Sequence, residues 1–218
     1  EDSLHYSHSY HEKGFLFAPF DDRKRAVIFP SQNAQILEES VKQYPTADKK
    51  ARIISVNSDD LKHKKFVQKG IKAIQDGLFR KVVLSRKETL ELEGFDCLSV
   101  FQSLLQTYSN AFVYLWYHPK VGMWIGATPE RLVLLKNKQF KTMALAGTQA
   151  YNGNQHPFWG EKERQEHQFV VDYIVDQIQD PDNGIVLNAF EVSKTYTSKA
   201  GNLLHLKADI EGEIGDFN

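Results

Sequence analysis

The sequence predicts an α+β fold in which antiparallel sheets pack against outer helices. Short apolar runs, several of them ended by proline, predict strands that follow one another in groups. Segments with apolar residues at helical spacing lie between these groups rather than after every strand. Strands grouped in this way favour antiparallel pairing over a parallel, doubly wound sheet.

The composition limits the classes of protein that the chain can represent. Its 218 residues are 41% hydrophobic, which supports a core for one domain over residues 1–218. The 27 basic and 28 acidic residues are interspersed and give a formal charge of −1, so no nucleic-acid partner is expected. The single cysteine, the lack of a membrane-length apolar run and the lack of a signal peptide predict a soluble, cytoplasmic protein.

The first 60 residues are expected to form strands, because "GFLFAPF", "RAVIFP" and "ARIISV" are short apolar runs. A helix is predicted next, where Phe66, Ile71 and Ile74 recur at helical spacing, with Asn57 or Ser58 as its N-cap. The run "KVVLSR", which begins at residue 81, is predicted to be a strand, and "DCLSVFQSLLQTY" to be a second helix.

Residues 111–148 are expected to form an antiparallel meander. "AFVYLWYH" turns at Pro119 and Lys120 into "GMWIGAT", which continues through Pro129 into "RLVLLKN" and returns along "QFKTMALAG". Two further strands are predicted in "IVLNAFEVS" and "LLHLKADIEGEI". The second of these alternates apolar and polar residues, which is typical of a strand with one buried face.

The stretch "EKERQEHQFVVDYIVDQI", residues 161–178, predicts an amphipathic helix with an unusual first turn. Its apolar residues share one face, and Glu163, Glu166 and His167 extend that face toward the N-terminus. Acidic residues in a first turn complement the helix dipole. Magnesium would also explain them, since it takes one or two protein carboxylates. From the residues alone, the two interpretations are equally good.

Two more charged residues have both a structural and a catalytic interpretation. Lys81 is either a solubilising strand end or a lysine whose pKa falls in a cleft, so that it can act as a general base. Glu130, in "GATPERL", is either a surface charge or a proton donor at a break between two strands. The common nucleotide-binding and zinc-binding signatures are not found in the sequence.

Five stretches, taken in order, resemble the motifs of the chorismate-utilising enzymes: "KVVLSR", "GATPERL", "ALAGT", "EKERQEHQFVVDYI" and "NLLHLKADIEGEI". This family includes isochorismate synthase, salicylate synthase, anthranilate synthase component I and aminodeoxychorismate synthase component I. The resemblance covers residues 65–214, and residues 1–60 match it weakly. It implies the N-terminal portion of the family's α+β fold, with two antiparallel sheets and outer helices.

The resemblance implies a role for each matching residue. Lys81 matches the lysine that activates water, and Glu130 matches the glutamate that protonates the departing hydroxyl. Glu166 matches a magnesium-binding glutamate. Glu163 stands where the family commonly has aspartate, and the role open to it is a contact with the metal through a water molecule. The positions implied to contact the substrate are Gly147, Thr148 and His205.

Within the family the sequence looks most like isochorismate synthase. Ala146 stands where aminodeoxychorismate synthases tend to have lysine, and "ALA" stands where anthranilate synthases commonly have Pro-Ile-Ala. The resemblance implies magnesium-dependent addition of water at C2 of chorismate with loss of the C4 hydroxyl. The product would serve menaquinone or siderophore biosynthesis, and no amidotransferase partner is implied. The alternatives are salicylate synthase, anthranilate synthase component I and, in another class, a non-catalytic binding domain.

Family members continue past "ADIEGEI" into a half that supplies a second magnesium-binding glutamate, residues for the substrate carboxylates and a glycine-rich loop. The chain is therefore expected to be truncated, and to be inactive or nearly so alone. Apolar strand edges would be left exposed, so self-association is also expected.

Overall fold

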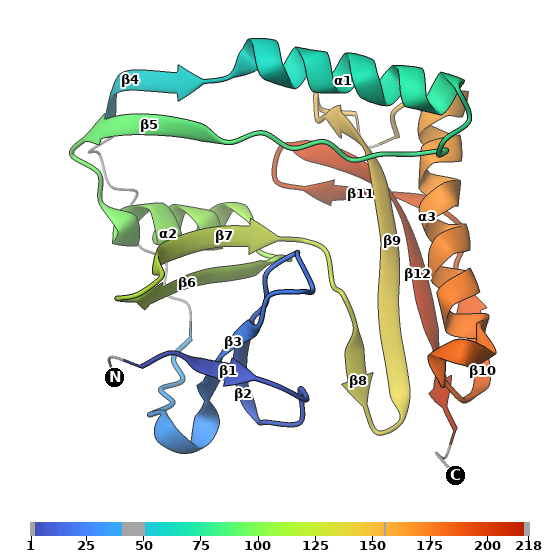
Figure 1. Ribbon diagram of the computed structural model, residues 1–218, viewed down its shortest axis with the longest axis horizontal. Coiled ribbons are helices and arrows are strands. Elements are labelled where there is room, and N and C mark those ends of the chain that lie inside the picture. The colour runs from blue at the N-terminus through green and yellow to red at the C-terminus, as the bar shows by residue number, and fades with distance from the viewer. Residues whose placement is uncertain (1–2, 41–50, 155, 216–218) are drawn as a thin grey trace. The chain divides into compact units, whose positions relative to one another are not determined.

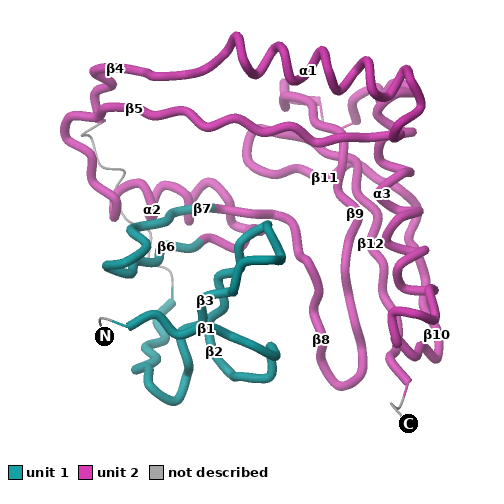
Figure 2. Tube along the Cα trace, in the orientation of Figure 1, with its two compact units in different colours: residues 1–45, 114–126 teal, residues 46–113, 127–218 magenta. Residues whose placement is uncertain are grey.

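The computed structural model, in which residues 3–40, 51–154 and 156–215 are described, confirms the predicted α+β class (Figure 1). It divides into two compact units, residues 1–45 with 114–126 and residues 46–113 with 127–218 (Figure 2). The single domain expected over the whole chain stays a prediction. Within the described residues, none of the helices has the length and apolar character of a membrane span.

The smaller unit contains a three-stranded antiparallel sheet of order β1-β3-β2 and a hairpin formed by β6 and β7. The strands are β1 (His5–Ser7), β2 (Gly14–Phe17), β3 (Ala26–Pro30), β6 (Phe112–His118) and β7 (Gly122–Thr128), and a 3-10 turn, η1 (Ser31–Asn33), follows β3. Its core is aromatic: the rings of Phe17 and Phe29 lie edge-on to Trp116, at centroid distances of 4.4 and 5.6 Å. The strands predicted in "GFLFAPF" and "RAVIFP" are confirmed.

The larger unit has a two-stranded sheet, a five-stranded sheet and the helices. β4 pairs with β5, and the five-stranded sheet has the order β10-β12-β9-β8, with β11 also paired to β12. The elements are β4 (Arg52–Ser58), α1 (Asp60–Gln75), β5 (Glu88–Glu93), α2 (Cys97–Thr107), β8 (Leu134–Lys136), β9 (Gln139–Ala150), α3 (Glu161–Gln179), η2 (Pro181–Asn183), β10 (Leu187–Val192), β11 (Tyr196–Ala200) and β12 (Leu203–Ile214).

Strand β12 is the centre of the five-stranded sheet. On one edge it pairs with β9 along almost its whole length, from Leu203 opposite Ala150 to Glu213 opposite Gln139. On the other edge its first half pairs with β11 and its second half with β10. The alternation predicted from "LLHLKADIEGEI" is confirmed between Leu204 and Ile210, where every second side chain is buried and those between are partly exposed.

Helix α3 covers one face of this sheet, as Figure 1 shows. Ala144 of β9 and Ala208 of β12 are fully buried against Val171 of α3, and Val170 and Ile174 pack around them. Two alanines at this point let the helix approach the sheet closely without a void. The face opposite α3 therefore carries the partly polar residues of β12.

The start of α1 differs from the prediction. Asp59, not Asn57 or Ser58, is the N-cap, and its side chain accepts a hydrogen bond from the amide of Lys62 at 3.3 Å. The two predicted caps are the last residues of β4, where pairing with β5 holds the backbone extended. A residue in a strand ladder cannot also close the first turn of a helix, so the cap moves to the next polar residue.

The strand predicted in "KVVLSR" is wrong. Within the described residues no strand includes 81–87, and β5 begins at Glu88. The ladder stops there because Glu88 is paired with Ser58, after which the chain of β4 turns into α1. Val82 and Leu84 instead lie over Gly70 of α1, where a Cβ would be 3.2 and 3.5 Å from their methyl carbons.

The prediction of one continuous meander over residues 111–148 is also wrong, because its second and third strands are not paired in the same sheet. β6–β7 and β8–β9 form two hairpins in separate sheets, and the chain between them leaves the ladder after Thr128. Pro129 has no amide donor for a ladder. The amide of Glu130 bonds the Thr128 hydroxyl at 3.2 Å, which is a local turn contact rather than a strand pair.

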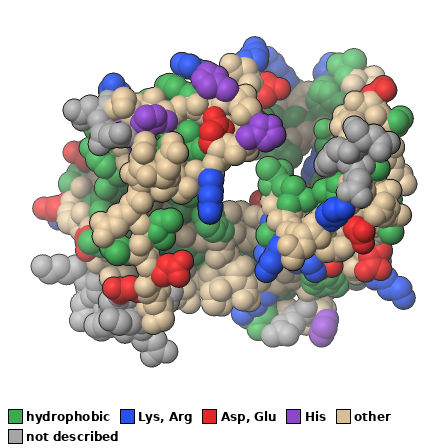
Figure 3. Space-filling view, turned by 90° about the horizontal axis from the view of Figure 1, so that it is seen from below, with side chains coloured by type: hydrophobic (Ala, Val, Ile, Leu, Met, Phe, Trp, Pro, Cys, Tyr) green, Lys and Arg blue, Asp and Glu red, His purple; other side chains and the backbone are tan. Residues whose placement is uncertain are grey.

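Apolar side chains are exposed on the larger unit. Phe66, Ile71 and Ile74 of α1, which the periodicity placed on one face, are 43, 51 and 40% exposed. On the face drawn in Figure 3, hydrophobic side chains lie among basic side chains (Lys, Arg) and acidic side chains (Asp, Glu). This mixture agrees with the interspersed charges of the sequence.

The packing of α3 on the sheet predicts the effect of Ala208→Leu. The extra carbons have no room against Val171 and Ala144, so the free energy of unfolding should fall by about 1–3 kcal/mol. Ala189→Leu, at an exposed position of β10, should change it by less than about 0.5 kcal/mol. Chemical denaturation of the two variants measures both values, and equal effects would contradict the close contact.

Candidate active site

A cavity of about 610 Å³ opens on the face of the five-stranded sheet that α3 does not cover. Met143, Leu145 and His205 lie on this face together with Lys207 and Asp209, because directly opposite residues of antiparallel strands share a face. The segment 128–131, which includes the predicted acid Glu130, forms part of the wall. Aromatic, acidic and basic side chains therefore line one cavity that is open to solvent.

A β-bulge at Gly147 organises one end of this cavity. His205 is opposite Thr148, but Leu206 is opposite Ala146, so Gly147 is left without a partner in the ladder. Its φ of +72° is the left-handed conformation that glycine adopts most readily. Because Gly147 is an extra residue, the side chains of β9 before and after it alternate between the two faces of the sheet out of phase with one another.

The bulge brings the three predicted substrate contacts together. Nδ1 of His205 lies 3.1 Å from the carbonyl oxygen of Gly147 and 3.2 Å from Oγ1 of Thr148. A carbonyl oxygen can only accept, so Nδ1 carries the proton in this arrangement and Nε2 of a neutral ring is left as the acceptor. The contact with the Gly147 carbonyl orients the ring of His205 and favours the tautomer with the proton on Nδ1.

The same bulge contacts the first turn of α3. A Cβ built on Gly147 would lie 3.4 Å from Cζ3 of Trp159 and 3.6 Å from Cβ of Glu163. Glu163 is half-buried in this position, whereas Glu161, in the same turn, is exposed. The acidic extension of the apolar face is therefore directed to the sheet and its bulge.

Lys81 and Glu166 form an ion pair with each other. Nζ of Lys81 is 2.6 Å from Oε1 of Glu166, and the two side chains are 24 and 37% exposed. Neither residue lines the 610 Å³ cavity; Lys81 lies in a smaller one, of about 370 Å³, with Phe169, Val170 and Tyr173 of α3. The predicted base is thus held by the predicted metal ligand and kept apart from Glu130.

His167 has a structural position. Its ring is buried, and Nε2 lies 3.3 Å from the carbonyl oxygen of Ala144 in β9. Burial, partly offset by that hydrogen bond, lowers the pKa of His167, so the ring is neutral near pH 7. This residue ties α3 to the sheet. Within the ranges that the structure describes, no three His, Cys, Asp or Glu side chains converge on a metal position.

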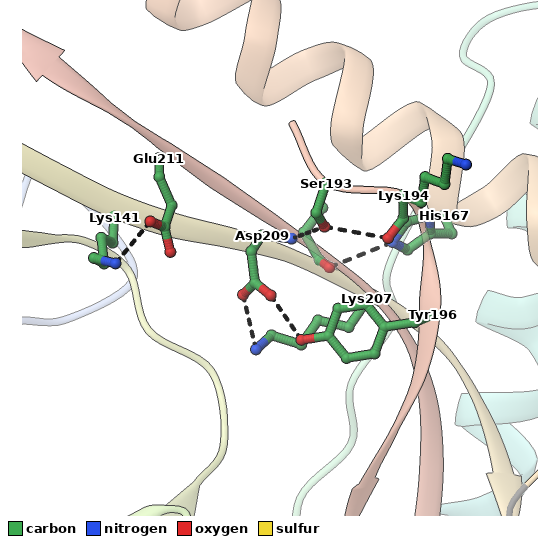
Figure 4. A network of polar contacts seen from close by, with 9 residues as sticks. Lys141, His167, Ser193, Lys194, Tyr196, Lys207, Asp209 and Glu211 are labelled. Atoms are coloured by element: carbon green, nitrogen blue, oxygen red, sulfur yellow. Dashed lines mark hydrogen bonds and ion pairs between the residues drawn. The ribbon is translucent and has the colours of Figure 1, made fainter. Parts of the chain in front are cut away.

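Three polar residues of the cavity side were not among the predicted site residues. The carboxylate of Asp209 accepts a hydrogen bond from Tyr196 at 2.7 Å and pairs with Lys207 at 2.8 Å (Figure 4). The alternation of β12, which placed Lys207 and Asp209 on the face of His205, was a sufficient signal for two of them. Tyr196 belongs to β11, a strand that the sequence did not predict.

The five-stranded sheet carries a charged cavity on its open face, which is the kind of place where proteins bind small molecules. The model of the family described as chorismate binding enzyme matches residues 15–217, and the chain belongs to that family. The predicted resemblance to chorismate-utilising enzymes is therefore confirmed.

Three relatives carry the name isochorismate synthase. A salicylate biosynthesis isochorismate synthase from Pseudomonas aeruginosa is 31% identical over 116 residues. A putative 2,3-dihydroxybenzoate-specific isochorismate synthase from Bacillus anthracis superposes with a TM-score of 0.76 at 22% identity. The menaquinone-specific isochorismate synthase from Escherichia coli gives 0.61 at 20% identity. The two structural likenesses show the fold.

The similarity covers different shares of each molecule. It includes 50% of this chain and 24% of the Pseudomonas protein, 93% of this chain and 55% of the Bacillus structure, and 83% of this chain and 43% of the Escherichia structure. The chain thus spans about half the length of the two solved structures and about a quarter of the Pseudomonas relative.

The bulge predicts a specific effect of Gly147→Ala. A side chain in the left-handed region should lower the free energy of unfolding by about 1–2 kcal/mol. Gly153→Ala is the matched control, because Gly153 also has positive φ but no neighbour within 4 Å of a new Cβ. Only Gly147→Ala should shift the imidazole NMR signals of His205. A shift of the same size in both variants would mean that the bulge does not position His205.

Proposed function

We propose that this protein acts on chorismate and converts it to isochorismate. The observation that carries the proposal is the cluster of Gly147, Thr148 and His205 at the edge of a cavity that Glu130 also lines. Three similar proteins bear the name isochorismate synthase, which supports the same reaction.

In the proposed reaction, water adds at C2 of chorismate, the ring double bonds shift, and the C4 hydroxyl leaves as water. Lys81, as a neutral amine, accepts a proton from the attacking water, and Glu130 donates a proton to the departing oxygen. Proton gain and loss balance, so the enzyme returns to its starting state after both residues exchange protons with solvent. His205 and Thr148 orient the ring from the sheet.

The ion pair between Lys81 and Glu166 has a consequence for this reaction. Nζ of Lys81 donates to Glu166 in this pair, and a nitrogen that donates to a carboxylate cannot accept a proton from water at the same time. Glu166 must therefore change partner before Lys81 can accept a proton. The proposed reaction requires a rearrangement of this pair in the complex with substrate.

Magnesium is proposed as the cofactor, because the carboxylates on α3 are the type of ligand that magnesium binds. Glu163 and Glu166 are three positions apart on one helix face, and magnesium takes one or two protein carboxylates with water and an anionic ligand as the rest. When bound, the ion would neutralise a carboxylate of the substrate. Glu166 would hold it directly and Glu163 through a water molecule.

The test of the function is conversion of chorismate followed by separation of the products. Turnover is measured with the 218-residue chain and with the whole product of its gene, and isochorismate is the expected product of the latter. Salicylate as the main product would favour the salicylate synthase alternative. No consumption of chorismate by either protein would favour a non-catalytic binding domain. We expect the 218-residue chain alone to be inactive or nearly so, and the same assay decides this.

Lys81→Ala should lower turnover by about 10²-fold or more in the whole gene product, because general-base catalysis contributes about 10²–10⁴-fold. Binding of chorismate should change by less than about threefold. Lys72→Ala is the control, since Lys72 also pairs with a carboxylate, Asp76, at 2.8 Å on α1. Turnover near the parent rate in Lys81→Ala would show that the base has been assigned wrongly.

Glu166→Gln should raise the magnesium concentration needed for half-maximal activity and weaken magnesium binding measured by calorimetry. Glu161→Gln removes the same charge from the same turn of α3 at an exposed position, and should leave both unchanged. If the two variants behave alike, the acidic first turn serves the helix dipole and not a metal.

A further inference from the structure

We propose that Lys207 is a carboxylate-binding residue of the cavity and holds one acid group of the substrate over the sheet. The identity of the substrate rests on the proposed function, whereas the anion site rests on the geometry of β12. Lys207 was not among the site residues predicted from the sequence.

The strand register places Lys207 on the cavity side. It lies opposite Leu145 of β9 and Tyr196 of β11, so the three side chains share one face of the sheet, and Lys207 and Leu145 line the cavity. Lys199 of β11 also borders the cavity but lies opposite Leu204, on the other face, with its ammonium 3.7 Å from the ring centre of Tyr151. Of these two lysines, Lys207 alone directs its charge to the open face.

Asp209 fixes the direction of the Lys207 side chain. One oxygen of Asp209 pairs with the ammonium and the other accepts from Tyr196, so the carboxylate is held at both ends. Its backbone is held as well, because the amide of Asp209 donates to Oγ of Ser193 and its carbonyl accepts from the amide of Ser193, both at 2.9 Å (Figure 4). The lysine is thus held, through Asp209, to backbone that is hydrogen-bonded on both of its polar groups.

The ammonium remains charged in this position. Burial favours the neutral amine, but hydrogen bonds to Asp209 and Tyr196 outweigh it and raise the pKa of Lys207. Lys207 is therefore a cation throughout the physiological range and is unsuited to act as a base. An ammonium has three N–H donors; the contacts with Asp209 and Tyr196 engage two of them, which leaves one for a ligand.

The spacing to His205 fits a ring acid. Lys207 and His205 are two residues apart on the same face of β12, which separates them by roughly 7 Å. A carboxylate bound to Lys207 would place a six-membered ring toward His205 and Thr148. Leu145 lies beside Lys207 and offers an apolar surface to such a ring.

The experiment compares binding of two ring acids, chorismate and benzoate, with binding of uncharged benzyl alcohol by calorimetry. Lys207→Met keeps the length of the side chain without its charge and should weaken both acids at least tenfold, with no change for the alcohol. Lys207→Arg should stay within about threefold of the parent chain. Lys141→Met is the matched control, because Lys141 pairs with Glu211 at 2.7 Å in the same sheet but does not line the cavity.

The outcomes separate this inference from the proposed function. Charge-dependent binding of benzoate at Lys207, without conversion of chorismate by the whole gene product, would remove the proposed function and leave the carboxylate site. Equal binding of the acids by Lys207→Met and the parent, or no binding of either acid by the parent, would overturn the carboxylate site. Unchanged thermal unfolding of Lys207→Met and Lys207→Arg would show that the comparison concerns binding and not folding.

Discussion

The antiparallel pairing of β9 with β12 is the interaction on which the rest of the larger unit depends. It sets which side chains face α3 and which face the cavity, and a shift of one residue would exchange the two sets. The core of Ala144, Ala208 and Val171 specifies this register, because only small residues fit under the helix. Gly147 changes the register locally, so the ladder continues while Thr148 comes opposite His205.

Elements with a strong period and a buried face could be predicted from the sequence. The alternation of β12 and the helical period of α3 were predicted correctly, because in each case one face packs on the other element. "KVVLSR" has the composition of a strand, but pairing requires a second strand, and β4 ends at Ser58. The start of α1 and the break in the meander depend in the same way on where a neighbouring strand stops.

The candidate site shows the same limit. The sequence predicted the individual residues from their motifs, and local structure brings Gly147 and Thr148 to His205 through one bulge. It could not predict the pairing of Lys81 with Glu166, because these residues are 85 positions apart and nothing in either motif specifies the contact. Tyr196 was not foreseen because a five-residue strand with no apolar alternation leaves little signal.

Two short strands share the outer edge of β12: β11 pairs with its first half and β10 with its second half. β10 and β11 are short, and Ser193 lies between them with hydrogen bonds to both backbone groups of Asp209. Because β10 and β11 each have about half as many ladder pairs with β12 as β9 has, we expect them to open locally before the ladder with β9 does. Tyr196 lies on this shorter-paired edge and donates to Asp209, so local opening of β11 would release Asp209 from one of its two side-chain contacts.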